Sequence, residues 1–330
     1  MTEDSVPRDS VTRLGTEKPL DVLVLAGGLS HERDVSLRSG ARVADALIDA
    51  GVSATVHDVD ADLLAVLDER RPDVVWPLLH GSTGEDGSIR DLLELVGVPS
   101  VGTGSAGSRI SWSKPVSKTI LARAGVATPA SATLPQSIFR EVGARAVLDR
   151  VVDRLGLPLV VKPAKGGSAL GVTLVHTKEA LPQAMVSCFS YGDVALIEQA
   201  VSGVELAISV VDLGDGPRAL PPVEIVVDDG PYDYDARYNA GRTEFFVPAR
   251  LPAEVLERAR RAAVTAHREL GLRHLSRTDL IVDAAGTPWF LEVNSAPGMT
   301  ETSTFPLAAE ASGLTLPQLY RGIVEAALPA

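Results

Sequence analysis

The sequence is poor in cysteine and lacks long apolar runs. Its single cysteine, Cys188, excludes an internal disulfide and fits a protein of the reducing cytoplasm. No Cys/His signature surrounds Cys188, so we interpret it as a packing residue rather than a nucleophile. No apolar stretch approaches the ~18 residues that a membrane span requires, and we expect no membrane partner.

Clustered positive charge is also lacking. The formal net charge is −12 and no long run of Lys and Arg occurs, so we do not expect nucleic acid as the main partner. A small anionic ligand is compatible with this charge if a metal ion and a few local cations surround its phosphates. Residues 1–17 are mixed in charge and have no apolar stretch, which indicates a disordered tail rather than a secretory signal.

Two common phosphate-binding fingerprints are missing. The pattern Gly-x-x-x-x-Gly-Lys-Ser/Thr does not occur, which excludes a P-loop. Gly27-Gly28 follows a strand-like run but does not complete Gly-x-Gly-x-x-Gly, which argues against a nicotinamide-dependent oxidoreductase. The six histidines show no metal-ligand spacing.

Apolar strands that alternate with helical patterns organise the chain. The run from Asp21 to Ala26, the turn at Gly27-Gly28 and a helical pattern over residues 35–50 form the opening of a doubly wound unit. A length of 330 residues suggests two or three domains. We predict an α/β (α+β) protein with a Rossmann-like unit at residues 18–104, a central unit at 105–197 and a C-terminal unit at 198–330.

Carboxylate and amide side chains are concentrated in a predicted hairpin near the C-terminus. Asp279 opens one strand, and Glu292 and Asn294 lie two residues apart on the other, so their side chains share a face. These oxygens suit a hard cation such as Mg²⁺. The alternative is a solvated polar face of an edge hairpin. The Pro-Gly turn in the following run, Asn294 to Thr300, favours the metal site because it presents backbone N–H groups where an oxyanion could lie.

Lys162 ends a predicted strand and precedes the Gly/Ser loop Gly166–Gly171. A lysine beside a mobile glycine-rich loop can hold phosphates by charge and by backbone N–H groups. The alternative is an ordinary hairpin with an exposed lysine.

Three other segments indicate substrate contacts, each with a simpler alternative. Glu32 can bind a substrate ammonium, or complement the dipole of the helix that follows. His80 lies near a strand end and can contact substrate, although a lone histidine is more often structural. The stretch Tyr232–Tyr238 is too polar for a core and indicates a water-excluding lid, or a surface loop packed by its own side chains.

In this order and at these separations, the motifs resemble those of the D-alanine–D-alanine ligases of the ATP-grasp superfamily. The resemblance covers the chain from about residue 20 to 325. Its matching blocks are Leu25–Ser36, Leu79–Gly87, Val161–Gly171, Tyr232–Tyr238, Arg277–Asp279 and Asn294–Thr300, continuing to Ser303 and Pro306.

The resemblance implies a three-domain ATP-grasp fold whose N-terminal domain is Rossmann-like. It implies ATP-dependent joining of two D-alanines through a D-alanyl phosphate, for peptidoglycan precursor synthesis, by a cytoplasmic homodimer. ATP would lie between the central and C-terminal domains with two Mg²⁺ ions, for which Mn²⁺ can substitute. D-alanine would bind where the three domains meet.

The resemblance also implies individual roles. Glu32, Ser168 and Tyr238 would form a hydrogen-bonded set that pins the lid, and Arg277 with the Gly298 N–H would stabilise the oxyanion. The implied amino-acid contacts are Glu32, His80 and Ser303. The implied metal ligands are Asp279, Glu292 and Asn294. The implied nucleotide contacts are Lys114, Lys162, Ser168, Glu198, Val201, Glu205 and Arg237.

Several positions depart from the family pattern. Trp112-Ser113 precede Lys114 where an acidic residue is usual, Gln199-Ala200 stand where Lys and an aromatic are usual, and Arg237 replaces Lys. They lie near the nucleotide and leave open a paralogous ligase that makes another dipeptide or a depsipeptide. The segment ending at Tyr238 matches the dipeptide-forming pattern. A non-catalytic nucleotide-binding regulator would be expected to lose a metal ligand, and none is lost here.

Overall fold

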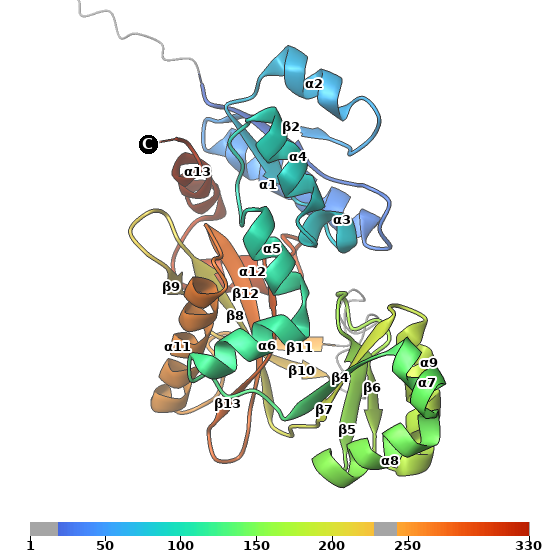
Figure 1. The fold of residues 1–330 in the computed structure, drawn as a ribbon. Coiled ribbons are helices and arrows are strands. Elements are labelled where there is room, and N and C mark those ends of the chain that lie inside the picture. Colours follow the sequence, from blue (N-terminus) through green and yellow to red (C-terminus); the bar gives the residue numbers. More distant parts are fainter. Residues whose placement is uncertain (1–18, 228–242, 330) are drawn as a thin grey trace, which may run out of the picture.

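The computed structural model describes residues 19–227 and 243–329 and is built from three sheets (Figure 1). The predicted tail at residues 1–17 and the lid segment, with Arg237 and Tyr238, lie outside the described residues.

The N-terminal sheet is parallel, with strand order β2-β1-β3, as the doubly wound pattern predicts. Gly40 of α1 lets this helix approach β1 closely, because a methyl group there would lie 2.5 Å from the Cβ of Ala26. The elements are β1 (Asp21–Leu25), α1 (Arg33–Asp49), β2 (Ser53–His57), α2 (Leu63–Arg70), β3 (Val74–Pro77), α3 (Ser82–Glu85) and α4 (Ser88–Val96).

The central sheet is antiparallel, with order β4-β7-β5-β6, and its helices cover one face (Figure 1). The predicted hairpin around the Gly/Ser loop is present as β5 and β6. The elements are β4 (Ser131–Pro135), α7 (Gln136–Val142), α8 (Ala144–Leu155), β5 (Leu159–Pro163), β6 (Thr173–Val175), the 3₁₀ helix η1 (Lys178–Ala180), α9 (Leu181–Phe189) and β7 (Val194–Gln199).

The C-terminal sheet has order β11-β10-β8-β12-β13, and β9 pairs with β8. Two helices that come early in the chain, α5 (Ser105–Trp112) and α6 (Lys114–Arg123), pack on β13. The other elements are β8 (Val204–Val211), β9 (Arg218–Ala219), β10 (Val223–Val227), β11 (Thr243–Phe246), α11 (Ala253–Glu269), β12 (Leu275–Val282), β13 (Pro288–Asn294), α12 (Thr304–Ala311) and α13 (Leu316–Ala326).

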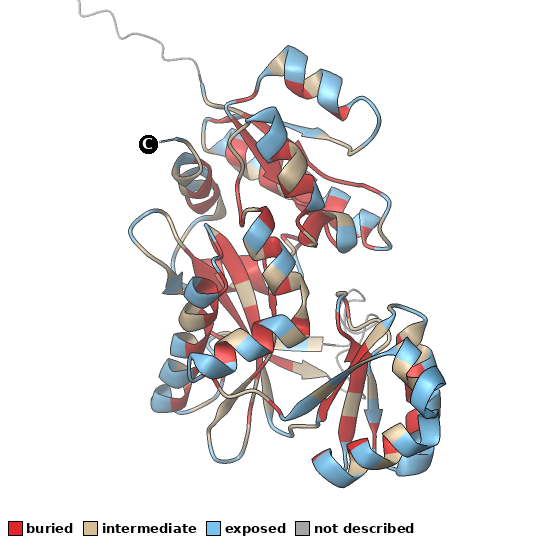
Figure 2. Ribbon diagram, in the orientation of Figure 1, coloured by how far each residue is buried: buried red, intermediate tan, exposed pale blue. Residues whose placement is uncertain are grey.

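The hydrophobic core is not divided equally among the three sheets. One cluster runs without a break from β1 and β3 to α12 and α13, where Trp76 meets Tyr320 edge-on at 5.4 Å between ring centroids. The central sheet has its own cluster, whose buried members all lie between Leu148 and Ile197. Figure 2 shows the buried strands and the exposed outer helix faces. The N-terminal and C-terminal sheets are therefore joined by apolar packing that the central sheet does not share.

The sheets divide the chain differently from the boundaries predicted at residues 105 and 198. Helices α5 and α6 contact the C-terminal sheet, although the sequence placed them in the central unit. Strand β7 of the central sheet continues to Gln199, past the predicted boundary. Periodicity identifies a helix but not the sheet that it covers, so the pattern alone does not assign these elements to a sheet.

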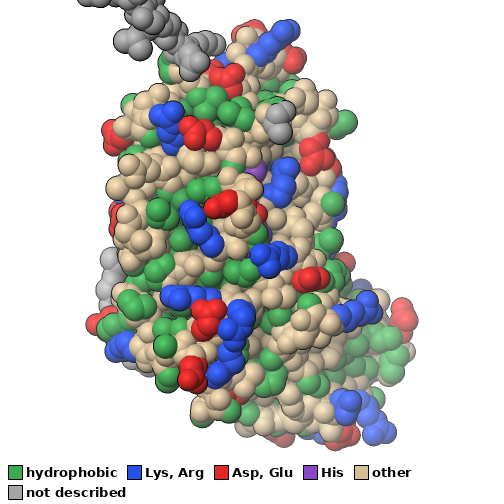
Figure 3. All heavy atoms as spheres, turned by 90° about the vertical axis from the view of Figure 1, so that its left-hand side faces the viewer, with side chains coloured by type: hydrophobic (Ala, Val, Ile, Leu, Met, Phe, Trp, Pro, Cys, Tyr) green, Lys and Arg blue, Asp and Glu red, His purple; other side chains and the backbone are tan. Residues whose placement is uncertain are grey.

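Charges of both signs are interspersed on the face that carries α11 and α13 (Figure 3). On α11, for example, Glu257 pairs with Arg260 and Arg261 at 3.9 and 3.5 Å. Among the described residues, no helix is both long and apolar enough to cross a membrane.

Candidate active site

Two adjoining pockets lie where the three sheets meet. The first is lined from all three sheets and contains Glu32, His80, Arg277 and Ser303. The second lies between the central and C-terminal sheets. The two pockets share a wall made of Lys114, Gly166, Gly167, Asp279 and Glu292.

The hairpin of β12 and β13 builds this wall. Its antiparallel register places Asp279 opposite Glu292 and Arg277 opposite Asn294, so all four side chains share one face. The prediction that Asp279 opens its strand is wrong, because β12 begins at Leu275 and Asp279 lies in its middle. The polar residues at its start resemble a turn in sequence, but β12 is central and pairs on both sides.

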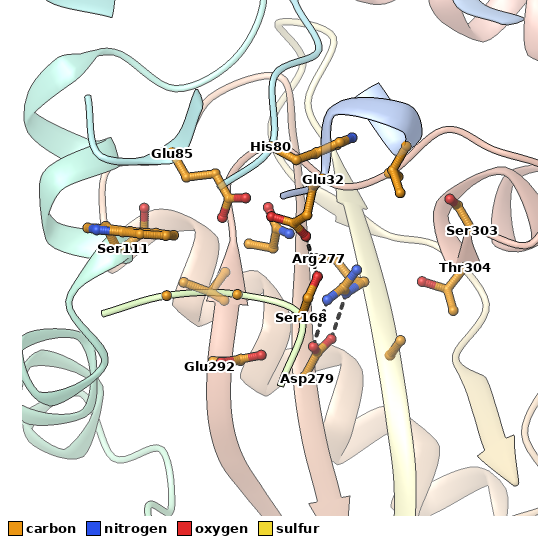
Figure 4. Close-up of a pocket in the computed structure, with 18 of the residues that line it drawn as sticks. Glu32, His80, Glu85, Ser111, Ser168, Arg277, Asp279, Glu292, Ser303 and Thr304 are labelled. Atoms are coloured by element: carbon orange, nitrogen blue, oxygen red, sulfur yellow. Dashed lines mark hydrogen bonds and ion pairs between the residues drawn. The ribbon is translucent and has the colours of Figure 1, made fainter. Parts of the chain in front are cut away.

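Arg277 binds Asp279 through two hydrogen bonds. Its Nε donates to Oδ1 at 2.7 Å and its Nη2 donates to Oδ2 at 2.8 Å. Asp279 is buried, so this two-point contact stabilises its charge where water cannot. Figure 4 shows Arg277 between Asp279 and Glu32.

The predicted metal ligands form a donor set that fits a hard cation. The carboxylates of Asp279 and Glu292 lie on the shared wall, and the Asn294 amide lies beside them in the first pocket. Lys114 Nζ lies 3.2 Å from Glu292. The Asn294 Oδ1 accepts the Ala296 N–H at 2.8 Å, which fixes the orientation of the amide. Within residues 19–227 and 243–329, no group of three His, Cys, Asp or Glu side chains is placed to hold a metal, so the set needs the Asn294 oxygen.

The cations predicted to contact phosphate lie at the second pocket or on its wall. Lys162 is buried and forms an ion pair with Glu198. The Lys114 Nζ donates to the Gly166 carbonyl at 2.5 Å, which ties the Gly/Ser loop to α6. Within that loop, Ser168 and Ala169 adopt left-handed φ values of 51° and 56°, and such strain is common where a loop clamps a ligand.

The remaining predicted nucleotide contacts are divided between the pockets. Glu198, Val201 and Glu205 line the second pocket with Lys162. Ser168 lines the first pocket instead, while its neighbours Gly167 and Ala169 line the second.

Lys118 is a buried cation that the sequence analysis missed. Its Nζ lies 2.8 Å from Glu198 Oε2 and donates to the Phe290 carbonyl at 3.1 Å. Burial, opposed by the charge of Glu198, lowers the pKa of Lys118 to about 8. The available signal was its position four residues after Lys114, on the same face of α6.

Glu32 and Ser168, two members of the hydrogen-bonded set that the family resemblance implies, meet across the first pocket. The Ser168 hydroxyl donates to Glu32 Oε1 although the two residues are 136 positions apart. Glu32 comes directly before α1 and makes no side-chain capping hydrogen bond to that helix.

His80 is buried at the edge of the first pocket. Desolvation lowers its pKa, so the ring is neutral at physiological pH. Its Nε2 is buried and has no hydrogen-bond partner among the described residues.

The predicted oxyanion loop is held by α1. The Met299 N–H donates to Ser39 Oγ at 3.1 Å, and Arg42 Nε donates to the Met299 carbonyl at 3.1 Å. Gly298 approaches Ser303 so closely that a methyl group there would lie 2.8 Å from its hydroxyl oxygen. Sequence reasoning missed Ser39 and Arg42, because nothing local connects α1 to a loop about 260 residues away.

Ser303 lies directly before α12, and its hydroxyl accepts the Thr300 N–H at 3.0 Å. A helix N-terminus favours an anionic group, which fits the predicted contact with a substrate carboxylate.

Comparisons with known proteins agree with this geometry. The family model described as D-ala D-ala ligase C-terminus matches residues 120–325. The D-alanine--D-alanine ligase of Pelotomaculum thermopropionicum is 39% identical over 309 residues, 94% of this chain and 97% of that protein. That of Bordetella avium is 41% identical over 301 residues, covering 91% and 92%.

Solved structures extend the agreement to the fold. D-alanine--D-alanine ligase from Bacillus anthracis complexed with ATP superposes with a TM-score of 0.78 at 30% identity, covering 94% of this chain and 97% of that chain. The VanG D-Ala:D-Ser ligase from Enterococcus faecalis superposes with a TM-score of 0.80 at 25% identity, covering 94% of this chain and 100% of that chain. The predicted α/β (α+β) fold of the ATP-grasp type is confirmed. By family model, by identity over almost the whole chain and by fold, the chain belongs to the D-alanine–D-alanine ligase family.

Proposed function

We propose that this chain uses ATP to join two D-alanines into D-alanyl-D-alanine, with release of ADP and phosphate, for peptidoglycan precursor synthesis. The observation that carries the proposal is the shared wall between the two pockets. A phosphoryl group can pass from a nucleotide on one side to a carboxylate on the other only if cations and metal ligands lie at their junction. Lys114, Asp279 and Glu292 lie there.

The first step is transfer of the γ-phosphoryl group to the carboxylate of the first D-alanine. Phosphorylation turns a poor electrophile into a good one, and its catalysis depends on positioning and charge more than on covalent help from the protein. Lys114 and Lys162 are suited to hold the phosphates, and Val201 and Glu205 to contact the nucleoside end. The Gly166–Gly171 loop is suited to cover the phosphates.

Two Mg²⁺ ions, or Mn²⁺ in their place, would be held by Asp279, Glu292 and Asn294. When bound, such ions neutralise the charge of the phosphate oxygens. Arg277 would then have two roles. It holds Asp279 by two hydrogen bonds, and its positive charge lines the first pocket.

The second step is attack by the amine of the second D-alanine on the acyl carbon. One carbon–nitrogen bond forms and the carbon–oxygen bond to phosphate breaks, with the negative charge passing through the carbonyl oxygen. The amine loses one proton, which the departing phosphate takes up. Arg277 and the Gly298 N–H are suited to stabilise that charge. Ser303, before α12, is suited to bind the carboxylate of the second D-alanine.

An acyl-phosphate hydrolyses in water, so the first pocket must be closed during the reaction. The hydrogen bond between Ser168 and Glu32 joins the central sheet to the N-terminal one and supports a closed state. We assign Tyr238 to the same set, and Arg237 to the nucleotide, from the family resemblance alone. A cytoplasmic homodimer is part of the same proposal.

A second candidate is a ligase that accepts a different second substrate. The likeness to a D-Ala:D-Ser ligase at a TM-score of 0.80 favours it, although the identity to that protein is only 25%.

Phosphate release and product identity, measured together, test the proposal. Purified protein with MgATP is assayed against D-alanine, D-serine, D-lactate and their L-enantiomers. We expect phosphate release and D-alanyl-D-alanine with D-alanine alone, and none with L-alanine. Release only when D-serine or D-lactate accompanies D-alanine would select the second candidate. The Asp279→Asn variant is the control, and it should lose turnover.

A further inference from the structure

Besides Glu32 and Asp279, a third buried carboxylate lines the first pocket, and none of the roles above uses it. Glu85 ends the short helix α3, is 8% exposed and lines the pocket beside Glu32. One of its oxygens accepts the Gly81 N–H at 3.0 Å. Figure 4 shows its carboxylate directed into the pocket, on the side where Glu32 and His80 lie.

The surroundings of Glu85 disfavour its charged form. Burial and, to a smaller extent, the negative charge of Glu32 raise the pKa of Glu85 to about 8. The Gly81 N–H, Arg277 and Lys114 act in the opposite direction and lower this pKa. Both of these cations already have carboxylate partners, since Arg277 binds Asp279 and Lys114 lies beside Glu292. His80 adds no positive charge, because burial keeps its ring neutral.

The pocket is polarised along its length. Glu32 and Glu85 lie at one end, and the hydroxyls of Ser303 and Thr304 lie at the other, with Arg277 between them (Figure 4). An amino acid is a zwitterion, so its ammonium matches the first end and its carboxylate is drawn toward Arg277.

We propose that Glu85 is a second anionic partner, beside Glu32, for the ammonium group of the first amino acid. This inference rests on the proposed function. An ammonium has three donors and can satisfy both carboxylates at once. Its positive charge also offsets the repulsion between the two carboxylates that would otherwise oppose ionisation of Glu85 beside Glu32.

Binding should therefore release a proton. Without ligand at neutral pH, Glu85 is mostly the neutral acid, and the entering ammonium favours its carboxylate. The Glu85 O–H bond breaks, the proton leaves to solvent and no bond of the substrate changes. Affinity for the amino acid then rises with pH until Glu85 is ionised without ligand, near pH 8.

The Glu85→Gln variant separates this role from a structural one. Gln keeps the shape and the oxygen that accepts the Gly81 N–H, and it loses only the charge and the titration. Glu69→Gln is the matched control, since Glu69 is exposed on α2, far from the pocket in sequence, and undergoes the same chemical change.

The readout is KM for D-alanine at the first site, at saturating MgATP, between pH 6.5 and 8.5. For wild type and Glu69→Gln, KM should fall by up to about tenfold per pH unit until it levels off near pH 8. For Glu85→Gln, KM should not depend on pH. It should match wild type at pH 6.5 and exceed it by about tenfold at pH 8, with kcat changed less than about threefold. Equal KM values for wild type and Glu85→Gln at every pH would overturn the role of Glu85.

Calorimetry keeps this test independent of turnover. D-alanine is titrated into protein with a non-hydrolysable ATP analogue at pH 7, in two buffers of different ionisation enthalpy. We expect release of most of one proton for wild type and none for Glu85→Gln; absence of release from wild type overturns the inference. Proton release without any phosphate release in the assay would contradict the ligase proposal while supporting the role of Glu85. If Glu85→Gln does not fold, Glu85→Asp keeps the charge and should retain the pH dependence of KM.

Discussion

At the scale of single residues, one hairpin carries both a pair of facing carboxylates and the arginine that binds one of them. Asp279 and Glu292 face each other across β12 and β13, and Arg277 holds Asp279 by two hydrogen bonds. The same guanidinium lines the first pocket. In the proposed mechanism, this arginine therefore fixes a metal ligand and offers charge to the oxyanion.

The Arg277→Ala variant should lose most of kcat while the fold survives. Removing one donor from an oxyanion site usually costs about 2.7–4 kcal/mol of transition-state stabilisation, or 10²–10³ in rate. Steady-state phosphate release measures the loss, and circular dichroism reports the fold. Arg277→Lys serves as the control, because it keeps the charge without the two-point geometry and should recover only part of the rate. Near-normal turnover of Arg277→Ala would reject its assigned role.

Many of the residues that line the site could be predicted from the sequence. The spacing of Asp279, Glu292 and Asn294 on a hairpin places them on one face, and the register confirms it. Glu85 could not be found this way. The pKa of Glu85 is raised by burial and by the charge of Glu32, which lies more than fifty residues earlier in the chain.

At the scale of elements, α6 connects two bodies that have separate cores. The helix packs on the C-terminal sheet, while Lys118 reaches Glu198 in β7 of the central sheet. Glu198 also binds Lys162 of β5, so one carboxylate bridges two buried lysines. Such a bridge fixes the angle between the sheets that enclose the second pocket.

The Lys118→Met variant should bind nucleotide more weakly and unfold more easily. It removes one of the two buried lysines that pair with Glu198, and loss of a charged contact of this kind lowers the unfolding free energy by about 1.5–3 kcal/mol. We expect KM for ATP to rise about tenfold with a smaller change in kcat. Urea unfolding and ATP kinetics measure the two effects. Lys178→Met is the control, since the pair of Lys178 with Asp149 is exposed and should contribute about 0–1 kcal/mol. Identical behaviour of the two variants would contradict the bridge.

Element boundaries were partly predictable. The strand–turn–helix opening, the β5–β6 hairpin and the long helix α11 follow directly from apolar periodicity and from glycine and proline positions. The assignment of α5 and α6 to a sheet could not follow, because their partners on β13 come about 180 residues later.

At the scale of the whole molecule, a histidine buried between α11 and β12 should make stability depend on pH. His267 is buried beside Ser276, with Nδ1 2.8 Å from the hydroxyl, and desolvation lowers its pKa to about 4. The folded pKa is thus below the unfolded value, so the unfolded chain takes up the proton first as pH falls. Stability from this residue is present above about pH 6.5 and is lost down to about pH 4.

Melting temperatures between pH 7 and pH 4 test this expectation. His267→Gln should lose part of the acid destabilisation, corresponding to at most about 3 kcal/mol. Exposed His176, changed to Gln, is the matched control and should leave the slope as in wild type. An unchanged slope in His267→Gln would show that other groups, such as the carboxylates, carry the whole effect.

The arrangement of the three sheets was predictable only through the family resemblance. Composition and periodicity give an α/β protein of two or three domains, but not that one apolar cluster joins the first sheet to α12 and α13. That continuity leaves the central sheet as the separately packed body. Closure of the site therefore concerns mainly how the central sheet approaches the other two.

The central claim is that a carboxylate in one pocket is phosphorylated from a nucleotide in the other before the new amide forms. D-alanine labelled with ¹⁸O in both carboxylate oxygens tests it most directly. The account predicts that each released phosphate carries one ¹⁸O atom, transferred from the carboxylate that was activated, as read by mass spectrometry. Phosphate released without label, while D-alanyl-D-alanine accumulates, would contradict the account.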